Sequence, residues 1–342
     1  MGRTSRPRSQ AGAAAISSSE RGCRRGRSSY GSGERPVSCL VSLRARFIAV
    51  LLGVGALCGS PAVAQVLKMD YQNNRMSGSL RSGAVEVNAQ QQRRINESGS
   101  NVLQPVAVVR VNGNEVGRLV GAEKWGGSPA AVVQIAEMDP ENPYPEVLLS
   151  SFTGGAHCCN QIQVLTSDRS GQTWREVTLG PFDGGDSPAE DPLRNGRFLI
   201  VDVDNRFLYR FACYACSTAP ARIWQLQGDA FVDVSHRPEF KPLHRRNLQR
   251  MADWFQQKNP ESPNGFLAGY VANKALVGEL YDGWDRMTQR YDASSDWGLK
   301  ECKGELDDNG KCLGREIVYS SFPEALRAFL IDTGYIKPTG EQ

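Results

Sequence analysis

Residues 106–120 read Val-Ala-Val-Val-Arg-Val-Asn-Gly-Asn-Glu-Val-Gly-Arg-Leu-Val. Two runs rich in valine stand on either side of Asn112-Gly113, and Asn-Gly is the strongest short-range signal for a tight β-hairpin turn. Branched side chains such as valine favour a strand because they pack well on its pleated surface. The stretch therefore predicts a hairpin of two antiparallel strands, and it indicates that the surrounding chain is built from β-sheet.

Similar strand-like runs follow along the chain up to residue 235, and Gly, Pro, Asn and Asp separate them. No apolar run between them has the length and the period of 3.6 residues that are typical of a long helix. The further predicted strands are 131–136, 147–152, 161–166, 174–179, 198–203, 207–212, 221–226 and 230–234. We therefore expect residues 65–240 to form a β-rich repeat domain.

Val132-Val-Gln-Ile-Ala-Glu-Met-Asp139 is similar to Arg197-Phe-Leu-Ile-Val-Asp-Val-Asp204, which indicates an internal repeat with a period of roughly 60 to 65 residues. Both segments are followed by a strand, a loop with cysteines, a second strand, and a turn that leads to a third strand. A repeated strand module predicts stacked or radially arranged sheets. We therefore expect a sandwich or a propeller-like fold.

Over residues 131–235 the chain resembles the FG-GAP and VCBS-like β-repeats of secreted and surface proteins. The resemblance implies a strand, an Asp-containing loop and another strand in each unit. The family's calcium loop follows an Asp-x-Asp-x-Asp-Gly pattern, whereas this chain has Asp139-Pro-Glu-Asn142 and Asp202-Val-Asp-Asn205 without a following glycine. Segments 154–159 and 213–216 also resemble parts of uncharacterised secreted bacterial proteins, and that likeness brings no assigned activity.

After Pro242 the apolar period changes from two residues to 3.6, which predicts a helical domain over residues 241–342. Ser262-Pro263 is expected to open a long amphipathic helix, and Ser321 with Glu324 to form a capping box at the start of a last helix. The apolar stripe of the long helix consists of Phe266, Tyr270, Val277, Leu280, Trp284, Met287 and Tyr291. The fold class is thus predicted as α+β, with an antiparallel β-repeat region followed by a helical C-terminal region.

Residues 1–64 have the features of a signal peptide with an over-long N-terminus. Two arginines precede the apolar run 47–57, and Ala62-Val-Ala64 provides a cleavage site. The apolar run is too short to anchor the product, since a membrane-spanning helix needs about 20 residues. We expect translation to start near residues 37–41 and the mature protein to be periplasmic or secreted, without a stable membrane anchor.

The charge of the mature chain differs from that of the whole sequence. After Ala64 the chain has 30 Lys and Arg residues against 35 Asp and Glu residues, a net charge of −5. It contains no basic block, whereas binding to nucleic acid needs clustered positive charge that neutralises phosphates. The composition therefore argues against nucleic acid as a partner.

Six cysteines follow the signal peptide, and an even number in an exported protein predicts three disulfides. These cysteines are Cys158, Cys159, Cys213, Cys216, Cys302 and Cys312. The first four lie in equivalent loops of the two repeat units, so we expect these loops to meet and to be joined by two disulfides across the units. The last two bracket Asn309-Gly310, which predicts a disulfide-closed hairpin or loop.

The candidate functional loop contains Gly154, Gly155 and His157, directly before the first cysteine pair. A zinc site is an alternative at this place, since thiolates together with an imidazole match the tetrahedral preference of zinc. Its ligands would be His157, Cys158, Cys213 and Cys216. The favoured expectation is that the protein holds neither a metal nor another cofactor, and calcium is the second alternative.

Two kinds of thiol chemistry are further alternatives. Cys213-Tyr-Ala-Cys216 has the spacing of a thiol–disulfide exchange site, although predicted strands rather than a βαβ unit flank it. A nucleophilic Cys158 or Cys159 with His157 as its base is disfavoured, because neighbouring side chains in an extended strand point to opposite faces. No acid, base and nucleophile converge elsewhere in the sequence, so no catalytic residue is assigned.

The sequence therefore predicts an exported, disulfide-stabilised binding or cell-envelope interaction protein without catalytic activity. Its expected partner is an envelope or extracellular protein or a glycan. The alternative is a metal- or thiol-dependent enzyme or redox protein centred on His157 and the two cysteine loops. The state of the thiols distinguishes the two hypotheses, because a binding module needs these sulfur atoms paired and the alternative needs some of them reduced or bound to metal.

Overall fold

The computed structural model describes residues 64–70, 76–123, 130–155, 157–184, 187–258, 262–305, 307 and 309–338. The chain divides into two units, 1–57 and 58–342, and all described residues belong to the second. The predicted signal peptide up to residue 63, with the predicted start near residues 37–41, lies outside the described residues.

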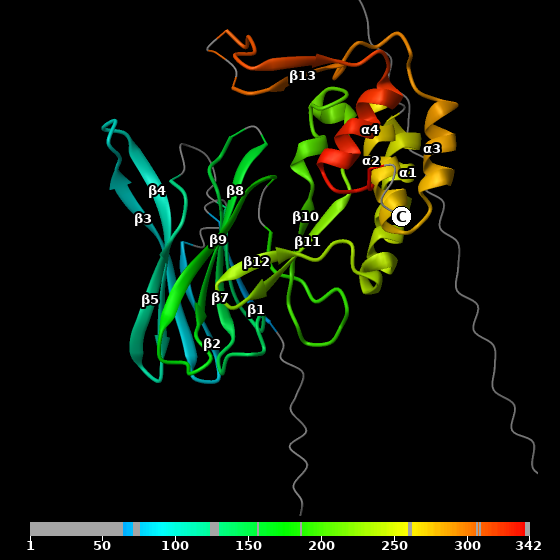
Figure 1. Cartoon of the computed structure of the whole chain (residues 1–342). Coiled ribbons are helices and arrows are strands. Elements are labelled where there is room, and N and C mark those ends of the chain that lie inside the picture. The colour runs from blue at the N-terminus through cyan, green and yellow to red at the C-terminus, as the bar shows by residue number, and fades with distance from the viewer. Residues whose placement is uncertain are drawn as a thin grey trace, which may run out of the picture. The chain divides into compact units, whose positions relative to one another are not determined.

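Two antiparallel sheets pack face to face in the β-rich part (Figure 1). Within the described residues, one sheet has five strands in the order β1-β6-β7-β8-β9, and the other has four in the order β2-β3-β4-β5. The bounds are β1 Gln65–Asp70, β2 Ser77–Ser82, β3 Val85–Ile95, β4 Asn101–Val111, β5 Asn114–Val120, β6 Ala130–Ala136, β7 Glu146–Phe152, β8 Cys158–Ser167 and β9 Trp174–Asp183. Apolar side chains of both sheets form one buried core between them, which includes Met69, Val87, Val109, Val133 and Leu149.

Strands β4 and β5 form the hairpin that the sequence predicts, with Val111 paired to Asn114. Asn112 has a φ of 50° and Gly113 a φ of 84°, so both residues of the turn have the left-handed backbone that this turn type requires. Asn and Gly tolerate this backbone better than other residues do. The predicted hairpin is therefore confirmed.

A third sheet covers the other face of the five-stranded sheet. Its strands are β10 (Ile200–Val203), β11 (Ala221–Gln227) and β12 (Ala230–Asp233). A second buried core between these sheets includes Leu148, Ile162, Val164, Ile200 and Leu226. Because β7 is covered on both faces, its side chains from Glu146 to Ser151 are all buried and its polarity does not alternate.

The two similar segments proposed as a repeat occupy different positions. β6 lies between β1 and β7 in the five-stranded sheet, whereas β10 lies at the edge of the three-stranded sheet. The predicted strand 207–212 is wrong, because a short 3₁₀ helix, η1 (Asn205–Phe207), is followed there by turns. Phe207 and Phe211 are fully buried in the core of the helical part, so their apolar character reflects that core rather than a sheet.

Helices follow the last of these strands, and Figure 1 shows them beside the three-stranded sheet. The helices are α1 Lys241–Lys258, α2 Asn264–Leu276, α3 Leu280–Thr288 and α4 Phe322–Asp332, with short 3₁₀ helices η2 Tyr214–Cys216 and η3 Pro238–Phe240. Strands β13 (Lys300–Lys303) and β14 (Arg315–Val318) pair between α3 and α4. The predicted fold class is confirmed: antiparallel sheets are followed by a helical C-terminal region.

The long amphipathic stripe belongs to two helices instead of one. Helix α2 ends at Leu276 and α3 begins at Leu280, and between them Gly278 has a left-handed φ of 84°. A helix ends readily at a glycine with this backbone. Among the described helices, none has the length and apolar character needed to cross a membrane.

The start of α4 differs in detail from the predicted capping box. Ser321 is the N-cap residue, but its side chain makes no capping hydrogen bond. Instead, the backbone N–H and the hydroxyl of Ser320 donate to Glu324 Oε2, at 2.8 and 2.6 Å. The helix ends at Asp332, and Gly334, two residues further on, has a left-handed φ of 84°.

Candidate functional site

The two cysteine loops that were expected to meet do lie side by side, since the rings of His157 and Tyr214 stack between them. Each loop closes on itself, however: Cys158 pairs with Cys159, and Cys213 pairs with Cys216. The pairing thus differs from the expected disulfides across the repeat units. The Cα atoms of Cys158 and Cys159 lie 3.0 Å apart across a cis peptide bond, and the register of β8 against β9 shifts at the same place.

The third disulfide closes a hairpin in the C-terminal region. Cys302, in β13, forms a disulfide with Cys312, which precedes β14, and the two strands pair with each other. Inside the loop, Asp307 Oδ1 accepts hydrogen bonds from the backbone N–H groups of Asn309 and Lys311, at 2.9 and 2.8 Å. The carboxylate thus organises the turn.

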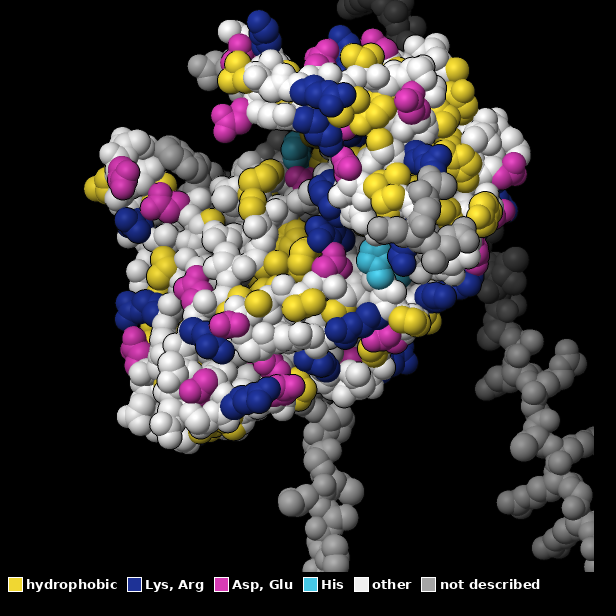
Figure 2. Space-filling model, in the orientation of Figure 1, with side chains coloured by type: hydrophobic (Ala, Val, Ile, Leu, Met, Phe, Trp, Pro, Cys, Tyr) yellow, Lys and Arg dark blue, Asp and Glu magenta, His cyan; other side chains and the backbone are white. Residues whose placement is uncertain are grey.

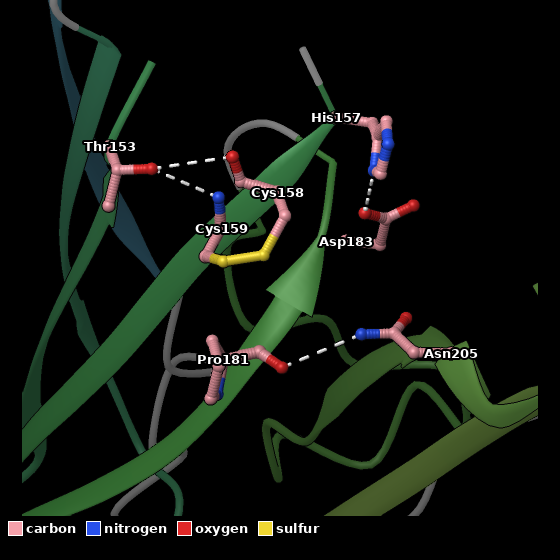
Figure 3. Close-up of a disulfide and its surroundings, with 7 residues drawn as sticks. All are labelled: Thr153, His157, Cys158, Cys159, Pro181, Asp183 and Asn205. Carbon is pink, nitrogen blue, oxygen red and sulfur yellow. Dashed lines mark hydrogen bonds and ion pairs between the residues drawn. A yellow bond between two sulfur atoms is a disulfide. The ribbon is translucent and has the colours of Figure 1, made fainter. Parts of the chain in front are cut away.

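The imidazole of His157 pairs with the carboxylate of Asp183. His157 Nδ1 lies 2.8 Å from Asp183 Oδ1, and the backbone N–H of Gly184 donates to the carbonyl of His157 at 2.6 Å. The Asp183 side chain is only 8% exposed, whereas that of His157 is 34% exposed. Figure 3 shows the ring directed at Asp183 and away from the sulfur atoms of Cys158 and Cys159. The imidazole is therefore part of the surface beside β9, and it points away from the disulfide.

Two tyrosines from the segment around η2 pack on this imidazole. Tyr214, which lies between the two cysteines of its loop, stacks on His157 with ring centroids 4.3 Å apart. Tyr209 lies 5.7 Å from His157 and 5.6 Å from Tyr214, again between ring centroids. Its hydroxyl lies 3.3 Å from His157 Nε2. In a neutral imidazole whose Nδ1–H donates to Asp183, Nε2 accepts from the Tyr209 hydroxyl.

A tryptophan from the C-terminal region completes what we call the ring cluster: His157, Tyr209, Tyr214 and Trp297. The indole N–H of Trp297 donates to the carbonyl of Tyr209 at 2.9 Å. The next residue, Gly298, packs so closely on the carbonyl of Arg210 that any side chain at this position would overlap it. The Arg210 guanidinium in turn donates to the carbonyl of Gly298 at 2.9 Å. These contacts hold the tryptophan beside Tyr209.

The ring cluster is open to solvent although it is tightly held. Tyr209 is 51% exposed and Trp297 is 45% exposed, high values for large rings fixed by hydrogen bonds. Tyr209 also has a left-handed backbone with a φ of 62°, which is rare for a bulky residue. Figure 2 shows that the surface on this face is hollowed between the sheets and the helical region, with a histidine side chain visible in the hollow.

The charged groups around the ring cluster are already partnered. Burial together with the nearby Asp183 carboxylate raises the pKa of Tyr214 to about 12, so this hydroxyl stays neutral. Ser187 Oγ donates to Asp202 Oδ2 at 3.0 Å, and burial raises the pKa of Asp202. Arg210 lies 3.8 Å from Glu301, the same carboxylate that binds Lys303. These charged groups are therefore engaged with protein partners, and the rings and hydrogen-bonding groups remain for a ligand.

The glycines of the predicted functional loop have a conformational role. Gly154 has a left-handed φ of 92°, and Gly155 approaches Cys158 so closely that a side chain would overlap its carbonyl oxygen. Both residues lie between β7 and β8, immediately before His157 on the described chain. They turn the chain so that His157, directly before β8, lies beside Asp183.

The donors of the alternative zinc site are engaged in other contacts. His157 Nδ1 faces Asp183, and Cys158, Cys213 and Cys216 are in disulfides. Within the described part of the chain, no three or more His, Cys, Asp or Glu side chains are grouped in a way that could hold a metal ion.

The aspartates that were compared with a calcium loop bind protein donors. Asp139 Oδ2 accepts from the backbone N–H of Gly228 at 2.7 Å. Asp204 is buried, and its Oδ2 accepts from Arg206 at 2.6 Å and from the hydroxyl of Tyr335 at 2.9 Å. These carboxylates therefore hold separate segments of the fold together.

Sequence reasoning identified His157 and the cysteine loops but missed Asp183, Tyr209 and Trp297. A signal existed for Tyr214, which stands inside the Cys-x-x-Cys segment, and a weaker one for Asp183, which opens a turn with two glycines. Tyr209 and Trp297 have no local signal, because 88 residues separate them and only the fold brings them together.

Comparison with known proteins places this architecture among bacterial relatives. The C-terminal part, residues 244–334, matches the family model of the sll0997 C-terminal domain. The chain is 45% identical over 265 residues to the probable thylakoid lumen protein sll0997 of Synechocystis, covering 77% of each chain. It is 35% identical over 222 residues to the uncharacterized protein y4bJ of Sinorhizobium fredii, covering 64% of this chain and 35% of that relative. No solved structure matches, and nothing in these comparisons supports FG-GAP or VCBS-like repeats.

Proposed function

The chain belongs to the family of the probable thylakoid lumen protein sll0997, and on this premise we propose that it is an exported binding protein without catalytic activity. The name of the relative places that protein in a compartment that lies outside the cytosol. A signal peptide cleaved near Ala64, as the sequence predicts, would deliver this chain to the periplasm or to the medium. The proposed partner is a component of the cell envelope or the extracellular space, a protein or a glycan.

The observation that supports this proposal is the exposed ring cluster. Tyr209 and Trp297 present large amphipathic rings to solvent, and such rings are enriched where proteins bind partners. The rings are pre-organised by hydrogen bonds to His157 and to the Tyr209 carbonyl, so little conformational freedom is lost on binding. The two local disulfides fix the loops that carry His157 and Tyr214.

The same geometry favours binding over catalysis. Both nitrogens of His157 already face protein groups, Asp183 on one side and the Tyr209 hydroxyl on the other. Cys158 and Cys159 are joined to each other and offer no thiolate nucleophile. The cluster is therefore suited to hold a ligand against its rings.

Site-specific photo-crosslinking tests the proposal in cells that export the protein. A benzophenone amino acid replaces Tyr209 or Trp297 in the ring cluster, or Tyr281 in α3 as a control that is 88% exposed. Adducts of defined mass at the first two positions, and none at the control, are expected. Equal yields at all three positions, or no adduct at Tyr209 and Trp297, would contradict the proposed binding surface.

The disulfides next to the ring cluster favour a second candidate, thiol–disulfide exchange. Cys158, Cys159, Cys213 and Cys216 are all partly exposed, and both pairs flank the contact between His157 and Tyr214. A dithiol substrate would be oxidised to its disulfide while Cys158–Cys159 is reduced to two thiols. Intact mass after alkylation during purification distinguishes the candidates: unalkylated protein favours the binding module, and alkylated cysteines in these two loops favour exchange.

A further inference from the structure

We infer that the ring cluster binds a neutral sugar residue of a glycan, with Tyr209 and Trp297 as its stacking surface. This inference rests on the proposed function and names the class of its ligand. It is carried by three properties of the cluster: the exposure of its rings, the hydrogen-bonding groups at their edges, and the pairing of Asp183, Asp202 and Arg210 beside it.

The first property concerns shape and polarity. One face of a pyranose ring carries mainly C–H groups, and such a face packs on an aromatic ring with both dispersion and electrostatic attraction. Tyr209 is 51% exposed and Trp297 is 45% exposed. The hydrogen bond from the indole N–H of Trp297 to the Tyr209 carbonyl keeps the two residues adjacent. Together they give a platform for one sugar residue or for neighbouring residues of a chain.

The second property concerns hydrogen bonds at the edge of the platform. The Tyr209 hydroxyl lies 3.3 Å from His157 Nε2, and a hydroxyl oxygen with this one contact keeps at least one lone pair for a donor from solvent. The contact between Nδ1 and Asp183 holds the imidazole in place. The site therefore presents an acceptor next to the rings, and sugar hydroxyls supply matching donors.

The third property concerns charge. An anionic ligand would meet the carboxylates of Asp183 and Asp202 without an unpaired cation to offset them. A cationic ligand would find the two described carboxylates nearest to His157 already engaged, because Asp183 is paired with His157 and Asp202 accepts from Ser187. Arg210 is likewise occupied by Glu301 and the Gly298 carbonyl. A ligand that is polar but uncharged fits these surroundings best.

Isothermal titration calorimetry on the oxidised mature protein tests the inference with defined hexasaccharides. The neutral probes are β-1,4-glucose, α-1,4-glucose, β-1,4-mannose and β-1,4-N-acetylglucosamine hexamers. A galacturonate hexamer and a deacetylated glucosamine hexamer serve as anionic and cationic probes. Binding of at least one neutral probe, tighter than that of either charged probe, is the expected result.

Variants connect this binding to the ring cluster. Tyr209→Ala and Trp297→Ala should each weaken the binding of the neutral probe roughly tenfold or more, which corresponds to about 1.4 kcal/mol. Tyr209→Phe, which keeps the ring and loses the hydroxyl, should have a smaller effect. Tyr281→Ala on α3 is the control and should bind like the wild type. Far-UV circular dichroism and thermal unfolding verify that each variant is folded.

Three results would overturn the inference: no binding of any neutral hexamer at millimolar concentration, preference for a charged probe, or binding that is insensitive to both ring variants. The photo-crosslinking experiment decides the proposed function separately. An adduct at Tyr209 with a protein, together with no binding of neutral sugars, would keep the binding surface and reject only the ligand class named here.

Discussion

Tyr209 combines an unfavourable backbone with an exposed side chain. Its left-handed φ of 62° costs a residue with a Cβ atom roughly 1–2 kcal/mol. Such outliers persist where surrounding contacts hold them, here the Trp297 indole on its carbonyl and the His157 ring at its hydroxyl. An exposed tyrosine contributes little to the core, so this conformation is best explained by what the ring does at the surface.

Replacing this residue should therefore separate stability from binding. We predict that Tyr209→Asn changes the free energy of unfolding by less than about 1 kcal/mol, because asparagine tolerates the left-handed backbone. The same variant should lose the binding activity of the ring cluster. Urea unfolding and calorimetric titration measure the two effects.

Tyr214→Asn is the matched comparison, since Tyr214 lies in η2 and stacks on His157. This variant should lower the free energy of unfolding more than Tyr209→Asn does. A larger loss of stability from Tyr209→Asn would show that the Tyr209 side chain supports the fold more than it serves the surface.

Glu146 is a buried carboxyl group at the start of β7. It is fully buried, and burial raises its pKa to about 7. The backbone N–H groups of Met138 and Asp139 and the side chain of Asn142 donate to it at 2.7, 3.1 and 2.6 Å. Desolvation of the buried carboxyl group raises the pKa of Glu146 by more than the hydrogen bonds from these donors lower it.

This group makes stability depend on pH in a defined direction. The folded protein binds the proton of Glu146 more tightly than the unfolded chain, whose carboxyl titrates near pH 4.5. The stabilising contribution is therefore complete below that pH and is lost as pH rises through about 7. We predict that chemical denaturation of the wild type shows a loss on the order of 3 kcal/mol from this group between pH 4.5 and pH 8.

Glu146→Gln isolates the contribution of this carboxyl group. The variant should be less stable at pH 4.5, by about 1 to 3 kcal/mol, because its single amide oxygen cannot serve both pairs of donors: Met138 and Asp139 donate to one carboxyl oxygen, and Asn142 and Thr166 to the other. This difference should shrink or disappear by pH 8, where the wild type has lost the contribution of the protonated carboxyl group. Its stability should also fall less between pH 5 and pH 8 than that of the wild type. Parallel pH profiles for the two proteins would contradict the assignment.

At the scale of elements, α2 packs against the Cys213–Cys216 loop by means of glycines. A Cβ atom at Gly269 would overlap the carbonyl oxygen of Thr218, and one at Gly265 would lie 2.7 Å from Ala212 Cβ. The two glycines are one turn apart, so they form a flat strip on one face of the helix. The backbone of the loop lies directly on this strip.

Adding a methyl group at this contact should force the helix and the loop apart. We predict that Gly269→Ala lowers the free energy of unfolding by about 1 to 3 kcal/mol, as overpacking of a tight contact does. In Gly283→Ala on α3 the new Cβ atom would lie 2.8 Å from Lys274 Cβ, a less severe overlap than the 2.3 Å between a Cβ atom at Gly269 and the Thr218 carbonyl oxygen. The second variant should lose less stability in urea unfolding, and the reverse order would contradict the backbone contact.

Local patterns predicted some elements well and failed for others, for physical reasons. The Asn112-Gly113 turn and most central strands depend on neighbours in sequence, so the predictions are confirmed there. Segment 207–212 looked like a strand because its apolar residues fit a period of two. Its phenylalanines instead enter the helical core, which lies far away in sequence. Gly278 also interrupts an otherwise continuous apolar stripe. The period of 3.6 residues continues across this glycine, so periodicity alone does not predict that one helix ends and another begins there.

At the scale of the whole molecule, Asp204 connects the end of β10 with the C-terminus. Its buried carboxylate binds Arg206 of η1 and the hydroxyl of Tyr335, which follows α4. Burial and the carboxylate raise the pKa of Tyr335 above its ordinary value, so the hydroxyl remains a donor. This buried polar contact thus joins the sheets to the helical region in addition to the apolar cores.

We predict that the sheets and the helices unfold together as a consequence. Tyr335→Phe should lower the unfolding free energy by about 1.5 to 3 kcal/mol, the range for a hydrogen bond to a charged group. Circular dichroism in the near and far ultraviolet should follow one common transition for wild type and variant. Tyr281→Phe, at an 88% exposed position, should leave stability unchanged. Two separate transitions would show that the connection through Asp204 does not couple the regions.

The candidate site was only partly predictable at this scale. The cysteines and His157 stand out as rare residues, and the expectation that their loops meet is confirmed by the stacking of His157 on Tyr214. The pairing of the cysteines was not foreseen, because alternation of side chains along a strand made an adjacent pair look improbable. Trp297 lies beside Tyr209 only in the folded protein, because 88 positions separate the two residues in sequence.

The three disulfides join cysteines separated by only 1, 3 and 10 positions in sequence. Each partner is therefore the nearest sulfur in sequence, and the short loops of Cys213–Cys216 and Cys302–Cys312 favour these two native pairs in random encounters. Cys158 and Cys159 are adjacent, so their pairing depends on the local backbone instead. Oxidative maturation then needs an electron acceptor but little reshuffling by an isomerase. Refolding from the reduced, denatured state should give the native pairs without a long-lived population of scrambled isomers. The same pairs should form during export, regardless of the order in which the cysteines cross the membrane.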